Sequence, residues 1–195
     1  MDASELRIWA FRILMLVFSI LFIIGSIKYF GAIFGFDDWY CYHSSISAGR
    51  YFFYSSICFL VSLGLVFKPF KNSKKFVAGV GLSFIFLFLM AACITNMYRV
   101  GLWGVYHNGN YIFYAAIAFL FFTISEYLVL DALYKSKKPK KVSLLNVLLL
   151  LGGIFTFLGM LIVLGAFLLP IWAFFQMFVL VRIAFFTIDE KILNS

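Results

Sequence analysis

The sequence has few charged residues for its length. Asp, Glu, Lys and Arg make up only 12% of the 195 residues, whereas 65% are hydrophobic. The mean hydropathy is +1.04. A water-soluble domain of this size needs a polar shell, and the chain holds too little polar material to form one. The composition therefore excludes an ordinary soluble domain and predicts an integral membrane protein.

Catalytic and cofactor-binding motifs are also lacking. The sequence contains no HExxH, no GxSxG, no CxxC, no Walker loop and no paired intramembrane aspartates. Its two histidines, His43 and His107, lie outside the long apolar runs, which excludes haem ligation by histidine pairs within the bilayer. The sequence thus identifies no catalytic residue and no cofactor, and it favours a protein that is not an enzyme.

Cysteine is scarce, with three residues that form no recognisable pair. Cys58 and Cys93 lie inside apolar runs, where cysteine is typically a small packing residue. Cys41 has no obvious partner, so we predict no structural disulfide.

Six apolar runs are long enough, or nearly so, to cross about 30 Å of hydrocarbon at roughly 1.5 Å per residue. They cover residues 8–30, 51–67, 76–97, 111–133, 144–164 and 168–188. Gly165 and Pro170 separate the last two, and Pro170 suits the first turn of the sixth helix. We therefore predict an all-α integral membrane protein with six transmembrane helices, forming a single transmembrane domain over residues 1–195.

The net charge of +8 indicates an orientation rather than a nucleic-acid partner, because the basic residues lie in short clusters between apolar runs. With the N-terminus inside, only Lys28, Arg50 and Arg99 lie on the outer side. The inner basic residues are Arg7, Arg12, Lys68, Lys71, Lys74, Lys75, Lys135, Lys137, Lys138, Lys140, Lys141 and Lys191. The positive-inside rule then predicts that both termini are cytoplasmic.

The lysine clusters on the inner side are expected to contact anionic lipid headgroups. The residues concerned are Lys71, Lys74, Lys75, Lys137, Lys138, Lys140 and Lys141. A docking surface for an acidic protein partner is the alternative interpretation.

Two stretches of the chain are similar, WYCYHSSISAGRYFFYSSICFL from Trp39 and WGVYHNGNYIFYAAIAFL from Trp103. Residues 49–60 align without gaps to residues 109–120, and an upstream gap of four residues aligns a further set: Trp39, Tyr42 and His43 with Trp103, Tyr106 and His107. Each stretch reads as an outer loop followed by an inward-going helix, which favours hairpins laid down as parallel repeats. Chance is the alternative, since Trp and Tyr are expected at a membrane interface and Phe is abundant here.

Polar residues inside the apolar runs are the candidate functional residues. Glu126 and Arg182 lie at comparable inner depths of the fourth and sixth runs, so an ion pair between them is geometrically feasible. The pair would either lock two helices together or form part of a proton or substrate relay. Asp131 is placed to pair with Lys135 by an i,i+4 contact. Asn96, Asn146 and Gln176 are expected to hydrogen-bond between helices.

The outer side offers one weaker candidate site. His43 and His107, with Asp37 and Asp38, supply side chains that bind divalent metals. Neither histidine has i,i+4 ligand spacing, and solvated interfacial histidines are the commoner case, so we assign no metal to these residues.

Two classes of function agree with these features. The first is a non-catalytic integral subunit or assembly factor of a larger membrane complex, with protein partners in the bilayer. The second is a small transporter or channel with an inner polar vestibule around Glu126 and Arg182. The sequence does not indicate which membrane holds the protein.

Overall fold

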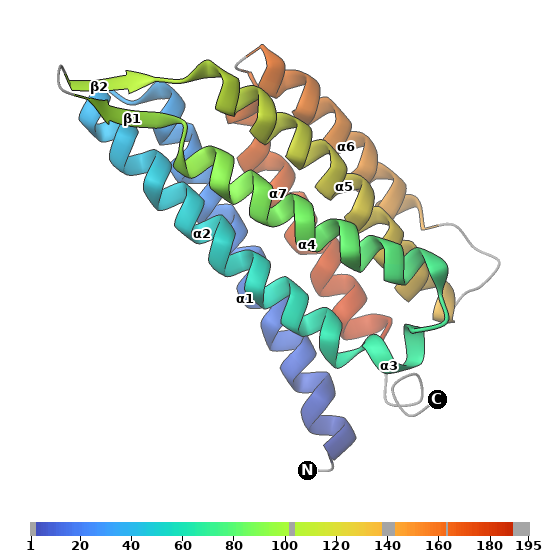
Figure 1. Ribbon diagram of the computed structural model, residues 1–195. Coiled ribbons are helices and arrows are strands. Elements are labelled where there is room, and N and C mark those ends of the chain that lie inside the picture. Colours follow the sequence, from blue (N-terminus) through green and yellow to red (C-terminus); the bar gives the residue numbers. More distant parts are fainter. Residues whose placement is uncertain (1–2, 102–103, 138–142, 163, 189–195) are drawn as a thin grey trace.

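The computed structural model describes residues 3–101, 104–137, 143–162 and 164–188, which are almost entirely helical (Figure 1). These residues form six long helices, each apolar and long enough to cross a membrane. The long helices are α1 (Ala3–Phe34), α2 (Asp38–Leu65), α4 (Lys74–Thr95), α5 (Gly109–Lys137), α6 (Leu144–Leu161) and α7 (Gly165–Phe186). The predicted all-α class is confirmed, and the six long apolar helices are compatible with a multi-pass membrane protein.

Three short elements join the long helices. The one-turn helix α3 (Phe67–Phe70) connects α2 to α4, and the strands β1 (Tyr98–Gly101) and β2 (Gly104–His107) connect α4 to α5. The start of α1, helix α3 and the end of α7 lie at one end of the bundle, and the two strands lie at the other (Figure 1). We call these the lysine-rich end and the hairpin end.

The six long helices form a closed ring in chain order. Each packs against the next, and α7 packs against α1 as well as α6. The middle of the ring is filled by aromatic side chains around Phe22 of α1. Its ring centroid lies 4.9 Å from that of Phe52 in α2, 5.8 Å from Phe122 in α5 and 5.8 Å from Trp172 in α7. All four side chains are buried, so interlocked rings occupy the centre of the bundle at this level.

Small residues bring α5 close to its neighbours. A Cβ at Gly79 of α4 would collide with the backbone oxygen of Ser125, and one at Gly153 of α6 would collide with the side chain of Thr123. The hydroxyl oxygens of Ser83 and Ser125 lie 2.9 Å apart in a hydrogen bond between α4 and α5. This arrangement of close backbones and short polar contacts is typical of helix packing within membranes.

Helix α2 begins well before the apolar run that predicts the second span, in a segment that the sequence predicts to be a loop. Helix α2 begins at Asp38 rather than Tyr51, and the Asp37 side chain accepts a 2.7 Å hydrogen bond from the Tyr40 backbone N–H at its first turn. A helix of 28 residues is about 42 Å long, more than the roughly 30 Å of hydrocarbon it must cross. Apolar residues mark only the part of a helix inside the bilayer. The first three turns of α2 are polar, so the apolar pattern predicts a loop there.

The second predicted outer loop contains an antiparallel hairpin. Tyr98 pairs with His107, and Gly104 takes a φ of +116° at the turn. The Tyr98 hydroxyl donates a 2.8 Å hydrogen bond to the Ala32 carbonyl, which anchors the hairpin to α1. Burial, with Cys41 nearby, raises the pKa of Tyr98, so this hydroxyl keeps the proton that it donates.

The start of α7 differs from its prediction as well. The helix begins at Gly165, so Pro170 lies in its second turn rather than its first. A Cβ at Gly165 would collide with the Met160 backbone, and this close approach makes a tight turn between α6 and α7.

Candidate functional site

Glu126 of α5 is fully buried and contacts α7. Gln176 Nε2 donates a 2.6 Å hydrogen bond to Glu126 Oε1. Glu126 Oε2 and Gln176 Oε1 have no hydrogen-bond partner among the residues that the structure describes. Gln176 therefore links two helices, as its position in the sequence predicts, and the pair retains unused hydrogen-bonding capacity.

The predicted ion pair between Glu126 and Arg182 is wrong. Arg182 is exposed, and the partner that the structure gives Glu126 is Gln176. Arg182 lies six residues beyond Gln176 on α7, about 9 Å nearer the lysine-rich end. At that depth a long arginine side chain reaches the polar surface instead of an internal carboxyl group.

Asn146 of α6 is also buried, and its side chain has no hydrogen-bond partner among the described residues. It is 2% exposed, and neither its Oδ1 nor its Nδ2 has a hydrogen-bond partner among the described residues. The side chain lines a cavity of about 20 Å³ together with Tyr134, Arg182 and Thr187. This volume is about that of one water-sized probe. Thus Arg182 lines the same cavity as Asn146, and the Asn146 side chain makes no hydrogen bond to another helix among the described residues.

Asp131 forms a charged cluster at the lysine-rich end. Its Oδ2 lies 3.0 Å from Lys75 Nζ of α4 and 3.1 Å from Lys135 Nζ of α5. The i,i+4 contact with Lys135 is the one that the spacing predicts, whereas the contact with Lys75 requires the packing of α4 on α5. Lys75 is therefore engaged in an ion pair as well as being exposed.

The structure describes only some of the remaining lysines that are predicted to contact lipid headgroups. Lys71 and Lys74 are exposed beside α3 and at the start of α4. Lys138, Lys140 and Lys141 lie outside the described residues, as does the side chain of Lys137.

Two arginines have contacts that the sequence did not reveal. Arg7 Nη2 donates to the Leu65 carbonyl at 2.7 Å, at the last residue of α2. Arg12 Nε donates to the Ala184 carbonyl at 3.1 Å, in the last turn of α7. Both satisfy carbonyls at helix C-termini, where a cation also interacts favourably with the helix dipole. Their partners lie far away in the sequence, so no local signal could have found them.

The described polar residues of the hairpin end do not gather into a metal site. His43 stacks on Trp39 with ring centroids 6.2 Å apart, while His107 lies 5.1 Å from the Tyr98 ring. Asp37 caps α2. In the described part of the chain, no group of three or more His, Cys, Asp or Glu side chains is arranged to hold a metal ion. The hypothesis of a site formed by His43, His107, Asp37 and Asp38 therefore gains no support.

Asn96 does not link helices, contrary to prediction. It is exposed at the end of α4, and its Nδ2 donates a 2.8 Å hydrogen bond to the Ala92 carbonyl of the same helix. Terminal carbonyls of a helix need partners, and Asn96 supplies one locally.

No protein-family model, curated protein or solved structure matches the chain. Any function must therefore be argued from the geometry of the bundle.

Proposed function

We propose that the protein is a non-catalytic integral subunit or assembly factor of a larger membrane complex. The observation that carries this proposal is a pair of exposed helix glycines, Gly64 of α2 and Gly81 of α4. Apart from its own turn of helix, a Cβ built at either position would meet no atom within 4 Å among the described residues. Nothing in the packing of those residues therefore requires glycine at these two positions.

Glycine inside a helix costs about 1 kcal/mol relative to alanine. Gly49, Gly79 and Gly153 offset this cost by allowing contacts with neighbouring helices that a Cβ would prevent. Gly64 and Gly81 allow no such contact with any other helix in the part of the chain that the structure describes. Glycine on the outside of a membrane helix lets another helix approach closely, so these positions favour a contact with a partner helix.

The surroundings of the two glycines suit such a contact. Helical spacing places Val61 one turn from Gly64, and Ala78 and Ile85 one turn on either side of Gly81, and all three are exposed. Helices α2 and α4 are neighbours in the ring. The exposed parts of both can therefore contribute to one interface, which we call the glycine face.

The proposal includes an orientation and a lipid contact. Both termini are cytoplasmic in it, because Lys68, Lys71 and Lys74 gather at the end where α1 starts and α7 finishes. Exposed Lys71 and Lys74 contact anionic headgroups on that side.

The proposal also includes that residues 49–60 and 109–120 arose by duplication of one segment. Both segments are helical, in α2 and α5. Aligned aromatic residues have the same exposure in the two helices: Phe53 and Phe113 exposed, Tyr54 and Tyr114 exposed, Phe59 and Phe119 buried. Equivalent roles at aligned positions favour duplication over chance, although the segments upstream differ in backbone conformation.

The test is purification of the full-length protein from its own membrane. We expect the wild type to retain a constant set of protein partners and the Gly64→Leu, Gly81→Leu double variant to lose them. Leu151→Phe is the matched control, because it adds bulk at an exposed position of α6. A wild-type protein that purifies without partners and moves solute in liposomes would contradict the proposal.

A small transporter is the second candidate, and one observation favours it. Glu126, Gln176 and Asn146, from three successive helices, are buried polar residues whose hydrogen-bonding capacity is not filled by the described residues. Buried polar side chains in a membrane protein often mark a substrate or ion pathway. Flux into liposomes that is lost in Glu126→Gln but retained in Arg182→Gln would support this candidate.

A further inference from the structure

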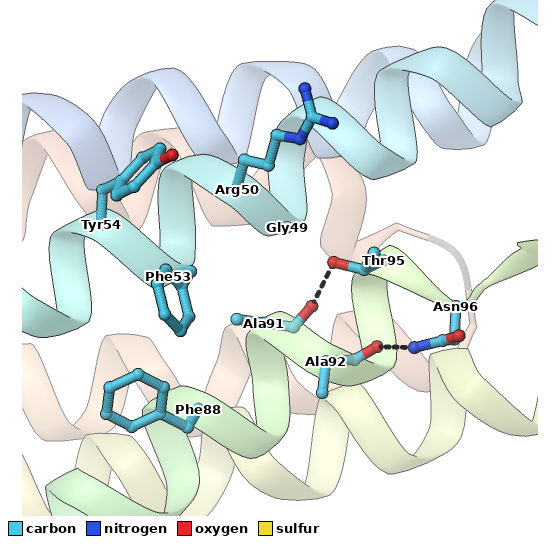
Figure 2. A pocket seen from close by; sticks show the side chains of 9 residues that line it. All are labelled: Gly49, Arg50, Phe53, Tyr54, Phe88, Ala91, Ala92, Thr95 and Asn96. Atoms are coloured by element: carbon cyan, nitrogen blue, oxygen red, sulfur yellow. Dashed lines mark hydrogen bonds between the residues drawn. The ribbon is translucent and has the colours of Figure 1, made fainter.

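A groove of about 440 Å³ opens between α2 and α4 near the hairpin end (Figure 2). Ala91 and Ala92 of α4 line it with small side chains. Phe53 points from α2 toward Phe88 of α4, with ring centroids 5.3 Å apart, and this pair bounds the groove on the side of the lysine-rich end. The lining is thus mainly apolar and is carried by two packed helices.

The close approach of the two helices defines the other boundary of the groove. A Cβ at Gly49 of α2 would collide with the Thr95 side chain in the last turn of α4. This contact brings the backbones together where α4 ends, so the shape of the groove depends on helix packing rather than on a loop.

Arg50 is the charged residue of the groove, and it is exposed. It borders the groove on α2, and in Figure 2 its side chain slants toward the hairpin end with the guanidinium pointing away from α4. The two polar residues of α4 are already bonded within their own helix: Thr95 Oγ1 to the Ala91 carbonyl and Asn96 Nδ2 to the Ala92 carbonyl, each at 2.8 Å. Arg50 forms no ion pair with any carboxylate in the described part of the chain. Among the polar side chains of the groove, the Arg50 guanidinium is therefore the one whose hydrogen-bond donors are free to bind an anion.

The depth of Arg50 indicates the kind of anion it would meet. It directly precedes the apolar run 51–67, and it is level with Thr95, the last residue of α4. Both positions place it at the boundary between hydrocarbon and headgroups, where lipid phosphates lie. Guanidinium groups bind phosphate oxygens through two parallel hydrogen bonds.

We propose that the groove binds one anionic phospholipid, with its phosphodiester on Arg50 and the first part of an acyl chain against Phe53, Phe88 and Ala92. The apolar lining and the single cation are complementary to the two parts of such a molecule. A soluble phosphate would leave the apolar lining unused, and an apolar partner helix would leave Arg50 without a counter-charge. This site lies at the hairpin end, opposite the lysine clusters, and it does not depend on the proposed subunit role.

The test is native mass spectrometry of the purified, delipidated full-length chain with phosphatidylglycerol or phosphatidylcholine of identical acyl chains. We expect a one-to-one adduct with phosphatidylglycerol, weakened about fivefold in Arg50→Gln, since one basic residue near a membrane surface contributes about that factor. Arg50→Lys should weaken it less. Ala92→Phe should also remove the adduct, because it fills the groove and keeps Arg50.

Two matched controls separate this site from general lipid binding. Lys28→Gln removes another exposed cation near the hairpin end, and Val77→Phe adds bulk at an exposed position elsewhere on α4. Both should bind phosphatidylglycerol as the wild type does, and circular dichroism confirms that every variant is folded. The proposal is overturned if Arg50→Gln and Ala92→Phe bind normally, or if phosphatidylcholine binds equally well. Loss of a co-purifying membrane protein in Ala92→Phe, without any lipid adduct in the wild type, would assign the groove to a partner helix instead.

Discussion

Gln176 Nε2 lies 2.6 Å from Glu126 Oε1, so an amide and a carboxyl group, both buried, connect α7 to α5 in the lysine-rich half of the bundle. These two helices are not neighbours in the ring of long helices, because α6 lies between them in chain order. The hydrogen bond is therefore a contact across the interior rather than along a helix seam. Whether it serves stability alone or also a pathway is decided by the flux experiment above.

Removing one partner of this pair should cost stability. In Gln176→Leu the buried carboxyl group of Glu126 loses its hydrogen bond, and we expect the free energy of unfolding to fall by about 1 to 3 kcal/mol. The double variant Glu126→Leu, Gln176→Leu should recover part of this loss, since no polar group is then left unpaired. Denaturation of the detergent-solubilised protein measures both changes.

Arg182→Gln is the control for that experiment. Arg182 is exposed, so its replacement should change the free energy of unfolding by no more than about 0.5 kcal/mol. An effect as large as that of Gln176→Leu would mean that Arg182, and not Gln176, is the partner of Glu126.

The same substitution at two glycines should have opposite effects. In Gly153→Ala the new methyl group meets Thr123, and we expect a loss of about 1 to 3 kcal/mol in the free energy of unfolding. In Gly81→Ala the methyl group meets nothing, so helix propensity should stabilise the isolated protein by up to about 1 kcal/mol. Thermal unfolding in detergent compares the two variants. Equal effects would show that the contact between α5 and α6 is not as close as described.

The charged cluster at the lysine-rich end should respond unequally to single changes. Asp131→Asn removes the carboxylate that both lysines share, whereas Lys75→Gln or Lys135→Gln leaves one ion pair in place. We therefore expect the largest fall in Tm for Asp131→Asn. The differences should shrink at high salt, because both lysines are exposed to screening ions. A Lys75→Gln variant as unstable as Asp131→Asn would mean that Lys135 contributes nothing.

Arg12 should stabilise the end of α7. Its Nε bonds the Ala184 carbonyl, and its guanidinium lies 5.2 Å from the centre of the Phe185 ring. Arg12→Gln removes the cation at the negative end of the helix dipole, which is typically worth about 0.3 to 1 kcal/mol. We expect faster amide hydrogen exchange in the last turn of α7, with Arg12→Lys intermediate. Unchanged exchange in that turn would contradict the capping role.

Helix α2 and the hairpin show where an apolar pattern is sufficient to predict local structure and where it is not. The pattern predicted the part of α2 from Tyr51 onward, because residues in hydrocarbon must be apolar. It missed the three turns before Arg50, since a helix that extends beyond the bilayer packs its polar residues on a neighbour and needs no continuous apolar run. The hairpin around Gly104 also lies outside the apolar runs, so the apolar pattern does not distinguish it from a loop.

In the candidate site, too, the sequence predicts some contacts, whereas others depend on how the helices pack. The spacing of Asp131 and Lys135 predicted their ion pair, because residues four apart on a helix face one another. The partner of Glu126 depended on which face of α7 turns inward, and that face carries Gln176 but not Arg182. The Arg7 and Arg12 contacts with α2 and α7 depended likewise on neighbours distant in sequence.

The sequence by itself determined that the chain holds six apolar segments, each able to form a helix long enough to cross a bilayer. A bilayer excludes unpaired backbone polar groups and charged side chains, and both constraints can be read along the chain. Tertiary structure alone decided that α7 returns to α1, that aromatic rings fill the centre, and that Arg50 borders a groove. Those features depend on how helix faces are rotated toward one another, and nearly uniform apolar surfaces carry little sequence signal for rotation.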